Sequence, residues 1–134
     1  ELGIFSKKDP LLITSFKPVK PGTSGAVSLP GSLASFLASL LIASSGFLFI
    51  SFSWDIFLII ILCGFIGSVI DSFLGATVQG QFQCQSCKRY TEKSHHCEVN
   101  ALLIKGKEWL DNDLVNIFSI LSATAMGIFF VYMI

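Results

Sequence analysis

The chain has 134 residues, of which 52% are hydrophobic and only 13% charged, and its nine basic and nine acidic residues give a formal net charge of zero. A chain this short has too little surface to bury three long apolar helices in a soluble core, so the composition argues against a soluble domain. We expect an all-α, polytopic membrane protein whose partner is a membrane lipid rather than a nucleic acid.

Charge-free length predicts three transmembrane helices. No charged residue lies between Lys20 and Asp55 or between Asp55 and Asp71, and none follows Asp113. The apolar runs near 30–51, 54–78 and 114–134 each supply the roughly 20 residues that a helix needs to cross a membrane. The chain then divides into a segment at 1–29, a helical hairpin at 30–78, a loop at 79–113 and a last helix at 114–134.

All nine basic residues fall outside these runs, in the first segment and in the long loop. The positive-inside rule places both in the cytoplasm, with an exterior turn at residues 51–55 and the C-terminus outside, and we expect the membrane to be the cell membrane. The basic residues are Lys7, Lys8, Lys17 and Lys20 in the first segment, and Lys88, Arg89, Lys93, Lys105 and Lys107 in the loop.

The start of the chain and the number of spans suggest a larger assembly. The chain opens on Glu1 rather than on Met, and three spans make a thin bundle. We expect either further helices upstream, in a larger helical bundle, or assembly with copies of the same chain.

The stretch at 16–25 combines two lysines with a Gly/Ser/Thr turn that leads into the first span. Glycine backbone N–H groups, a helix N-terminus and ammonium groups suit phosphate oxygens. The candidate phosphate contacts are Lys17 and Lys20, with Gly22, Thr23 and Gly25 as candidate substrate- or nucleotide-binding positions. The alternative is a basic linker held near anionic lipid.

The second span carries Gly64, Gly67, Asp71 and Gly75 on one stripe. Glycines let another helix approach closely, whereas an acid inside a span is expensive and usually faces the bundle interior for function. Asp71, about two turns from the cytoplasmic end of this helix, is therefore a candidate catalytic residue. The alternative is a packing stripe on which Asp71 reaches the membrane interface.

The long loop contains a C-x₂-C pair, Cys84 and Cys87, followed by His95, His96 and Cys97, which resembles half of a zinc ribbon. Three thiolates and one of the two imidazoles would complete a tetrahedron around a structural Zn²⁺ ion. A disulfide is disfavoured on the reducing cytoplasmic side, and Cys63 has the pattern of an ordinary buried thiol. The alternatives are unligated cysteines or a site completed by another chain.

A polar cluster leads into the third span: Asp111, Asn112, Asp113 and Asn116. Asp113 and Asn116 are three residues apart, and Asn112 and Asn116 four apart, so each pair can share a face of a helix that begins near Asp111. Carboxylate and amide oxygens grouped in this way suit Mg²⁺. The alternative is that Asp111 is a plain N-cap, although capping explains only one of the four residues.

Four blocks of the sequence occur in a characteristic order: Glu1-Leu-Gly, the stretch at 17–25, Gly67-Ser-Val-Ile-Asp71-Ser-Phe-Leu-Gly75-Ala-Thr-Val-Gln79, and Leu110-Asp-Asn-Asp113-Leu-Val-Asn116. Together they resemble the integral-membrane family that contains transmembrane protein 19 and the plant phytyl-phosphate kinase. In that family Glu1 would follow an Asp-Thr-x-Ala-Ser motif, which agrees with further chain upstream. The chain departs from the family in its Cys/His loop, and in Ser24-Gly25-Ala26, where relatives often run Gly-Gly.

The family is also similar, more distantly, to CTP-using membrane enzymes, namely dolichol and phytol kinases and phosphatidate cytidylyltransferases. This resemblance implies that Lys17 and Lys20 handle a nucleoside triphosphate such as CTP, and that Asp71, Asp111 and Asp113 hold Mg²⁺. The resemblance adds further candidate substrate- or nucleotide-binding residues, namely Ser72, Gln79, Asn112 and Asn116.

The expected function is therefore a membrane-embedded, Mg²⁺-dependent transferase that acts on an isoprenoid (phytyl or prenyl) phosphate. It is either an isoprenoid-phosphate kinase or a cytidylyltransferase-like enzyme, with CTP as the candidate nucleotide. Positioning and charge neutralisation dominate phosphoryl transfer, and lysines with metal-bound carboxylates supply both. The alternative is a non-enzymatic membrane scaffold, or a small transporter with Asp71 on a polar pathway. Acids that cluster at one interface beside lysines favour the transferase.

Overall fold

The computed structural model describes residues 9–51 and 53–134. Three long helices dominate it, α1 (Leu29–Gly46), α2 (Trp54–Thr77) and α3 (Asn112–Met133). All three are long and apolar enough to cross a membrane, and at most 17% of the most apolar stretch of each is buried inside the protein. The prediction of three helices that could span a membrane is therefore confirmed by length and composition, and most of their apolar surface is not buried inside the protein.

The first helix is shorter than predicted, because it ends at Gly46 rather than near residue 51. The hydroxyls of Ser44 and Ser45 donate to the carbonyls of Leu40 and Ile42, and the chain after Gly46 continues in turns. Serine hydroxyls that bond back to the preceding turn weaken a helix, and glycine has low helix propensity. The prediction followed hydropathy, which does not register these local effects.

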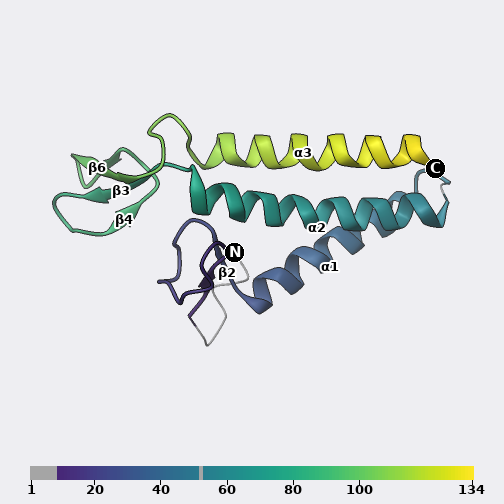
Figure 1. Cartoon of the computed structure of the whole chain (residues 1–134), viewed down its shortest axis with the longest axis horizontal. Helices are drawn as coiled ribbons and strands as arrows, with labels where there is room; N and C mark the ends of the chain where they lie inside the picture. Colours follow the sequence, from purple (N-terminus) through teal and green to yellow (C-terminus); the bar gives the residue numbers. More distant parts are fainter. Residues whose placement is uncertain (1–8, 52) are drawn as a thin grey trace.

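The central helix is α2, which packs against both α1 and α3. Figure 1 shows α2 and α3 side by side and antiparallel, with α1 lying at a slant to α2. A Cβ on Gly64 would lie 2.8 Å from Oγ of Ser39 in α1, and a Cβ on Gly67 would lie 3.0 Å from Cβ of Ala123 in α3. The predicted glycine stripe therefore serves two neighbouring helices rather than one.

One small antiparallel sheet precedes the helical hairpin in the chain, and a second one follows it. The first pairs β1 (Leu11–Leu12) with β2 (Ala26–Val27). The second contains β3 (Gln81–Cys84), β4 (Tyr90–Thr91), β5 (His95–His96) and β6 (Val99–Lys105) in the order β4-β3-β6-β5.

These sheets mean that the all-α class predicted from the sequence is not confirmed. Burial alternates along β3, where Phe82 and Cys84 are buried. The strands are only two to seven residues long, however, and an alternation this short is a weak signal in a sequence. Pairing with partners elsewhere in the chain, rather than local pattern, makes these segments strands.

Both sheets lie at the same end of the helices, beside the start of α1, the end of α2 and the start of α3 (Figure 1). The connection between α1 and α2 and the C-terminus lie at the opposite end. The described basic residues, from Lys17 to Lys107, therefore gather at the end that carries the sheets. Lys7, Lys8 and the Glu1-Leu-Gly block lie outside the described residues.

Candidate functional site

The loop at 20–25 packs against the last turn of α2. Gly25 has a φ of +78°, and a Cβ at this position would collide with the backbone of Ala76. From the other side, a Cβ on Gly75 would lie 3.0 Å from the backbone nitrogen of Gly25. Two facing glycines thus bring the lysine-bearing loop to the end of the helix that carries Asp71, while Lys17 and Lys20 remain exposed.

A long-range hydrogen bond joins this loop to the second sheet. Oγ of Ser24 donates to Oε1 of Glu92 at 2.7 Å, across 68 residues of sequence. Glu92 directly follows β4. In the same loop, Oγ1 of Thr23 donates to the carbonyl of Lys20 at 2.7 Å, which closes the turn. The loop is therefore held between the second sheet and α2.

Asp71 lines a polar cavity of about 250 Å³ between the start of α1 and α2. Ser28 caps α1, since its Oγ accepts a hydrogen bond from the backbone N–H of Gly31 at 3.2 Å. The cavity combines a carboxylate and serine hydroxyls with the partial positive charge of a helix N-terminus. Its serine residues are Ser28, Ser32, Ser35, Ser68 and Ser72.

A second cavity, of about 560 Å³, lies between the second sheet and the start of α3. Oδ1 of Asp111 accepts a hydrogen bond from the backbone N–H of Leu114 at 2.9 Å, so Asp111 is the N-cap of α3. Asn116 is exposed and does not line this cavity. The lining residues are Phe82, Glu92, Lys93, Ser94, His95, Glu108, Asp111, Asn112 and Asp113.

The structure does not gather the three candidate metal-binding aspartates in one place. Asp71 lines the first cavity, whereas Asp111 and Asp113 line the second. Within residues 9–51 and 53–134, these acids do not belong to any group of three or more converging ligand atoms. Because Mg²⁺ is usually held by one or two carboxylates together with phosphate oxygens and water, each cavity offers at most part of a Mg²⁺ ligand set.

Gln79 lies beside the two facing glycines and is 3% exposed. Its Oε1 is 3.2 Å from the position that a Cβ on Gly75 would take, and its Nε2 has no hydrogen-bond partner in the described part of the chain. A buried donor without a partner costs about 1–3 kcal/mol. A ligand with an acceptor oxygen near Gly25 and Gly75 would remove this cost.

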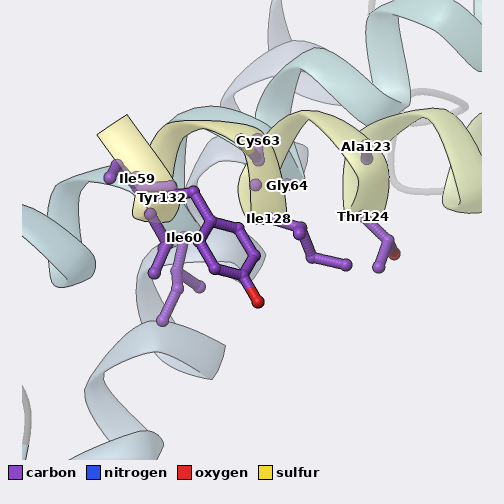
Figure 2. A pocket seen from close by; sticks show the side chains of 10 residues that line it. Ile59, Ile60, Cys63, Gly64, Ala123, Thr124, Ile128 and Tyr132 are labelled. Atoms are coloured by element: carbon purple, nitrogen blue, oxygen red, sulfur yellow. The ribbon is translucent and has the colours of Figure 1, made fainter. Parts of the chain in front are cut away.

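An apolar groove of about 660 Å³ runs between α2 and α3, farther along the helices from the sheets. Figure 2 shows its lining, with Ile59 and Ile60 from α2 beside Ile128 and Tyr132 from α3. The small residues Gly64 and Ala123 also line it. The groove therefore presents an apolar surface in the part of the molecule that would lie within the membrane.

Four side chains of the second sheet converge as a candidate metal centre, since the ligand atoms of Cys84, Cys87, His96 and Cys97 all lie within 4.8 Å of one another. The Sγ atoms of Cys87 and Cys97 are 3.8 Å apart, which matches the edge of about 3.8 Å of a tetrahedron with Zn–S bonds of about 2.3 Å. Nδ1 of His96 lies 3.6 Å from Sγ of Cys87 and 3.1 Å from Sγ of Cys97. His95 lines the second cavity instead.

Hydrogen bonds give the thiols of this cluster very different acidities. The hydrogen bond from the backbone N–H of Cys87 is the main cause that lowers the pKa of Cys84 to about 6, against the effect of burial and with help from the His96 side chain. The side-chain hydrogen bond with Cys87, together with burial, raises the pKa of Cys97 to about 11. A bound metal ion would displace the remaining protons, because the thiolate is the form that binds metal.

Comparison with known proteins places the chain in a family. Residues 1–124 match the family described as "Integral membrane protein DUF92". The chain belongs to this family. The membership predicted from the four sequence blocks is thereby confirmed.

The relatives of this DUF92 chain include plant and archaeal proteins. Protein PGR of Arabidopsis thaliana is 37% identical over 132 residues, which cover 90% of this chain and 45% of PGR. The chloroplastic protein VTE6 of the same plant is 31% identical over 120 residues, which cover 90% of this chain and 29% of VTE6. An uncharacterized membrane protein of Methanocaldococcus jannaschii is 42% identical over 80 residues, covering 57% of this chain and 32% of that protein. The chain thus spans less than half the length of these relatives, and no solved structure matches it significantly.

The DUF92 chain also contains candidate site residues that the sequence motifs do not indicate. One is Glu92, whose carboxylate accepts the hydrogen bond from Ser24 in the loop at 20–25. The others are the serines of the Asp71 cavity, apart from Ser72. Their spacing is a usable signal, because Ser28, Ser32 and Ser35 recur at four and three residues and so share one face of a helix.

Proposed function

We propose that this DUF92 chain is the catalytic part of a membrane-embedded transferase that phosphorylates an isoprenoid phosphate, using a nucleoside triphosphate such as CTP. The plant phytyl-phosphate kinase of the same family supports this class of substrate. The observation that carries the proposal is the cavity in which Asp71 meets serine hydroxyls at the N-terminus of α1.

The phosphate of the lipid occupies the Asp71 cavity in this proposal. Serine hydroxyls are suitable donors to phosphate oxygens, and the positive end of a helix favours an anion. Ser28, Ser32 and Ser72 are the candidate donors, because Ser35 and Ser68 already donate to backbone carbonyls. Asp71 alone would repel a phosphate, so a Mg²⁺ ion held by Asp71 would have to supply the compensating positive charge. One carboxylate with phosphate oxygens and water is a donor set that Mg²⁺ accepts, and Asp71 would hold the ion there, oriented by its hydrogen bond from Ser119.

The isoprenoid tail then lies in the apolar groove between α2 and α3 (Figure 2). Gly64, which lines the groove, precedes Asp71 by about 10 Å along α2, at about 1.5 Å of rise per residue. A chain anchored by its phosphate at Asp71 would therefore meet the groove as it enters the membrane. The lining is mostly apolar and suits a hydrocarbon tail, with the hydroxyls of Thr124 and Tyr132 as its polar groups.

The second cavity is the proposed nucleotide site. Asp111 and Asp113 provide carboxylates for Mg²⁺, and Lys93 provides a positive charge for phosphate. Glu92 lines this cavity and also binds Ser24, which lies in the loop that leads to the Asp71 cavity. The loop at 20–25 therefore lies between the two proposed substrates, where the exposed Lys17 and Lys20 would contact their phosphates.

In the proposed reaction the protein positions the two substrates and neutralises their negative charge. An oxygen of the lipid phosphate attacks the terminal phosphorus of the nucleotide and forms a new P–O bond. The bond from that phosphorus to the bridging oxygen breaks, and the nucleoside diphosphate leaves. Because the attacking oxygen is already anionic, no general base is needed. The lysines neutralise part of the negative charge of the phosphates, and Mg²⁺, when bound, would supply further positive charge.

In this proposal the protein lies in the cell membrane, and the end that carries the sheets faces the cytoplasm. Both described basic segments lie at that end, as the positive-inside rule requires of cytoplasmic segments. This orientation presents both cavities to cytoplasmic nucleotide, and it places the phosphate of a lipid in the same leaflet at the level of Asp71.

A thermal-shift measurement tests the proposal. The full chain in detergent should be stabilised by CTP or pyrophosphate only when Mg²⁺ is present, since ligand binding to the folded state raises stability. Lys93→Gln should weaken the shift, whereas Lys105→Gln, which removes a lysine outside both cavities, should not. A membrane scaffold would show no thermal shift with any nucleotide. A shift of the same size with and without Mg²⁺ would exclude the proposed Mg²⁺ site.

A further inference from the structure

We propose that Cys84, Cys87, His96 and Cys97 bind one structural Zn²⁺ ion, and that this ion positions the loop at 20–25 through the hydrogen bond between Glu92 and Ser24. The metal site is independent of the proposed transferase. The second part concerns the same loop as the proposed function, and it is tested below without any assay of activity.

The ligand set selects the metal. Three thiols and one imidazole, with all ligand atoms within 4.8 Å of one another and the sulfur atoms of Cys87 and Cys97 3.8 Å apart, form the Cys₃His arrangement of structural zinc sites. Soft thiolate ligands favour zinc over Mg²⁺ or Ca²⁺, which prefer oxygen. Four protein ligands leave no open position for substrate or water, so the ion would hold the fold rather than take part in the reaction.

The backbone around the cluster is bent in a way that a bound metal explains. Lys88, just after the C-x₂-C pair, has a φ of 57°, and Cys97 and Glu98 have φ values of 52° and 59°. Residues other than glycine adopt this left-handed conformation only where their surroundings hold them in it. The backbone N–H of Lys88 bonds to the carbonyl of Cys84 at 3.0 Å, so the first turn is closed around its two thiols. Both bends aim their cysteines at the same point.

The cluster is linked to the loop through a short series of contacts. Glu92 lies between the ligands Cys87 and His96 in the chain, and Ser94 nearby accepts a hydrogen bond from the backbone N–H of Ala101 at 2.8 Å. The Glu92 carboxylate receives the hydroxyl of Ser24 at 2.7 Å. Gly25, the next residue, packs against Ala76 of α2. Loss of the metal would free the segment that carries Glu92 and so release the loop.

Metal analysis of the purified full chain tests the first part. About one equivalent of zinc is expected in the native chain and in Cys63→Ser, which makes the same chemical change in a thiol outside the cluster. The Cys84→Ser/Cys87→Ser double variant should lose it. A native chain without zinc, or one in which mass spectrometry finds Cys87 and Cys97 joined as a disulfide, would overturn the site even if the double variant fails to fold.

The two adjacent histidines provide a sharper test. His96→Gln should release zinc to a chromogenic chelator at least ~10-fold faster than His95→Gln. Loss of a residue that only hydrogen-bonds to a metal ligand already lowers metal affinity by about 10–100-fold, so loss of the ligand itself should cost at least as much. Equal release from both variants would exclude His96 as a ligand.

Hydrogen–deuterium exchange tests the link to the loop. Removal of zinc by a chelator should speed exchange at residues 23–26 several-fold, and leave the turn at 47–50 at the other end unchanged. In Ser24→Ala, exchange at 23–26 should already be fast and should respond little to the chelator. If zinc leaves and the loop does not respond, the link is wrong while the metal site stands, and neither result depends on transferase activity.

Discussion

Asp71 in α2 and Ser119 in α3 are 48 residues apart in the chain and are joined by a hydrogen bond of 3.4 Å from the serine hydroxyl to the carboxylate. Ser119 is 5% exposed. Its hydroxyl also donates to the carbonyl of Asn116 at 2.9 Å, so its one proton is shared between the two acceptors. The acid of one span is therefore held by the next span. The helix that begins at Asp111 thus helps to set the position of Asp71.

Replacement of Asp71 by asparagine should abolish most transferase activity. Asp71→Asn removes the charge that would hold Mg²⁺ and changes the volume little, so turnover should fall at least ~100-fold, which corresponds to about 2.7 kcal/mol of transition-state stabilisation. Asp55→Asn makes the same change in the first turn of the same helix, at the opposite end, and should retain turnover within about twofold. Full turnover in a well-expressed Asp71→Asn variant would show that the acid has a structural role only.

Removal of the Ser119 hydroxyl should weaken the contact between α2 and α3. Ser119→Ala is expected to lower stability by about 0.6 kcal/mol more than Ser122→Ala, the average value of hydrogen bonds between membrane helices. Ser122 is the matched control because its hydroxyl bonds only the carbonyl of Phe118 in its own helix. The measurement is the free energy of unfolding in detergent. In an Asp71→Asn background the difference between the two variants should shrink, and a difference that persists unchanged would mean that Asp71 is not the partner.

The two left-handed glycines of the loop at 20–25 should respond differently to alanine. Both Gly22→Ala and Gly25→Ala place a side chain at a positive φ, which costs about 1–2 kcal/mol. A Cβ on Gly22 meets nothing within 4 Å, whereas a Cβ on Gly25 collides with the backbone of Ala76. Gly25→Ala should therefore lose a further ~1–3 kcal/mol, the usual cost of overpacking. Thermal unfolding of the two variants side by side provides the measurement, and equal losses would place the loop away from α2.

Labelling from outside the cell should report the orientation of the chain. Ser51 lies between α1 and α2, at the end away from the sheets, so a membrane-impermeant maleimide should label Ser51→Cys in intact cells. Lys93→Cys, at an exposed position of the loop at 79–113, should stay unlabelled until the cells are opened, and the native chain is the control for background reaction. Labelling of Lys93→Cys above this background in intact cells would reverse the proposed topology.

The sequence alone determined the number and approximate place of the three long apolar helices, and the residue types of the candidate metal cluster. Both depend on local quantities. Charge-free length predicts a span without knowledge of any neighbour, and the spacing of Cys84, Cys87 and Cys97 within one loop already restricts which atoms can meet. The four family blocks are likewise a property of residue order, and the family match confirms them.

Only the tertiary structure decided which of these residues meet. Successive residues of a strand point to opposite faces, so His96 joins the cysteines while its neighbour His95 lines the second cavity. Asp71 and Asp113 are both aspartates at the end of the helices that carries the sheets, yet they line different cavities. Asp71 lines the cavity between the start of α1 and α2, whereas Asp113 lines the cavity between the second sheet and the start of α3. The bond between Ser24 and Glu92 spans 68 residues, and no local pattern encodes it, because it exists only once the two sheets have been brought to the same end of the helices.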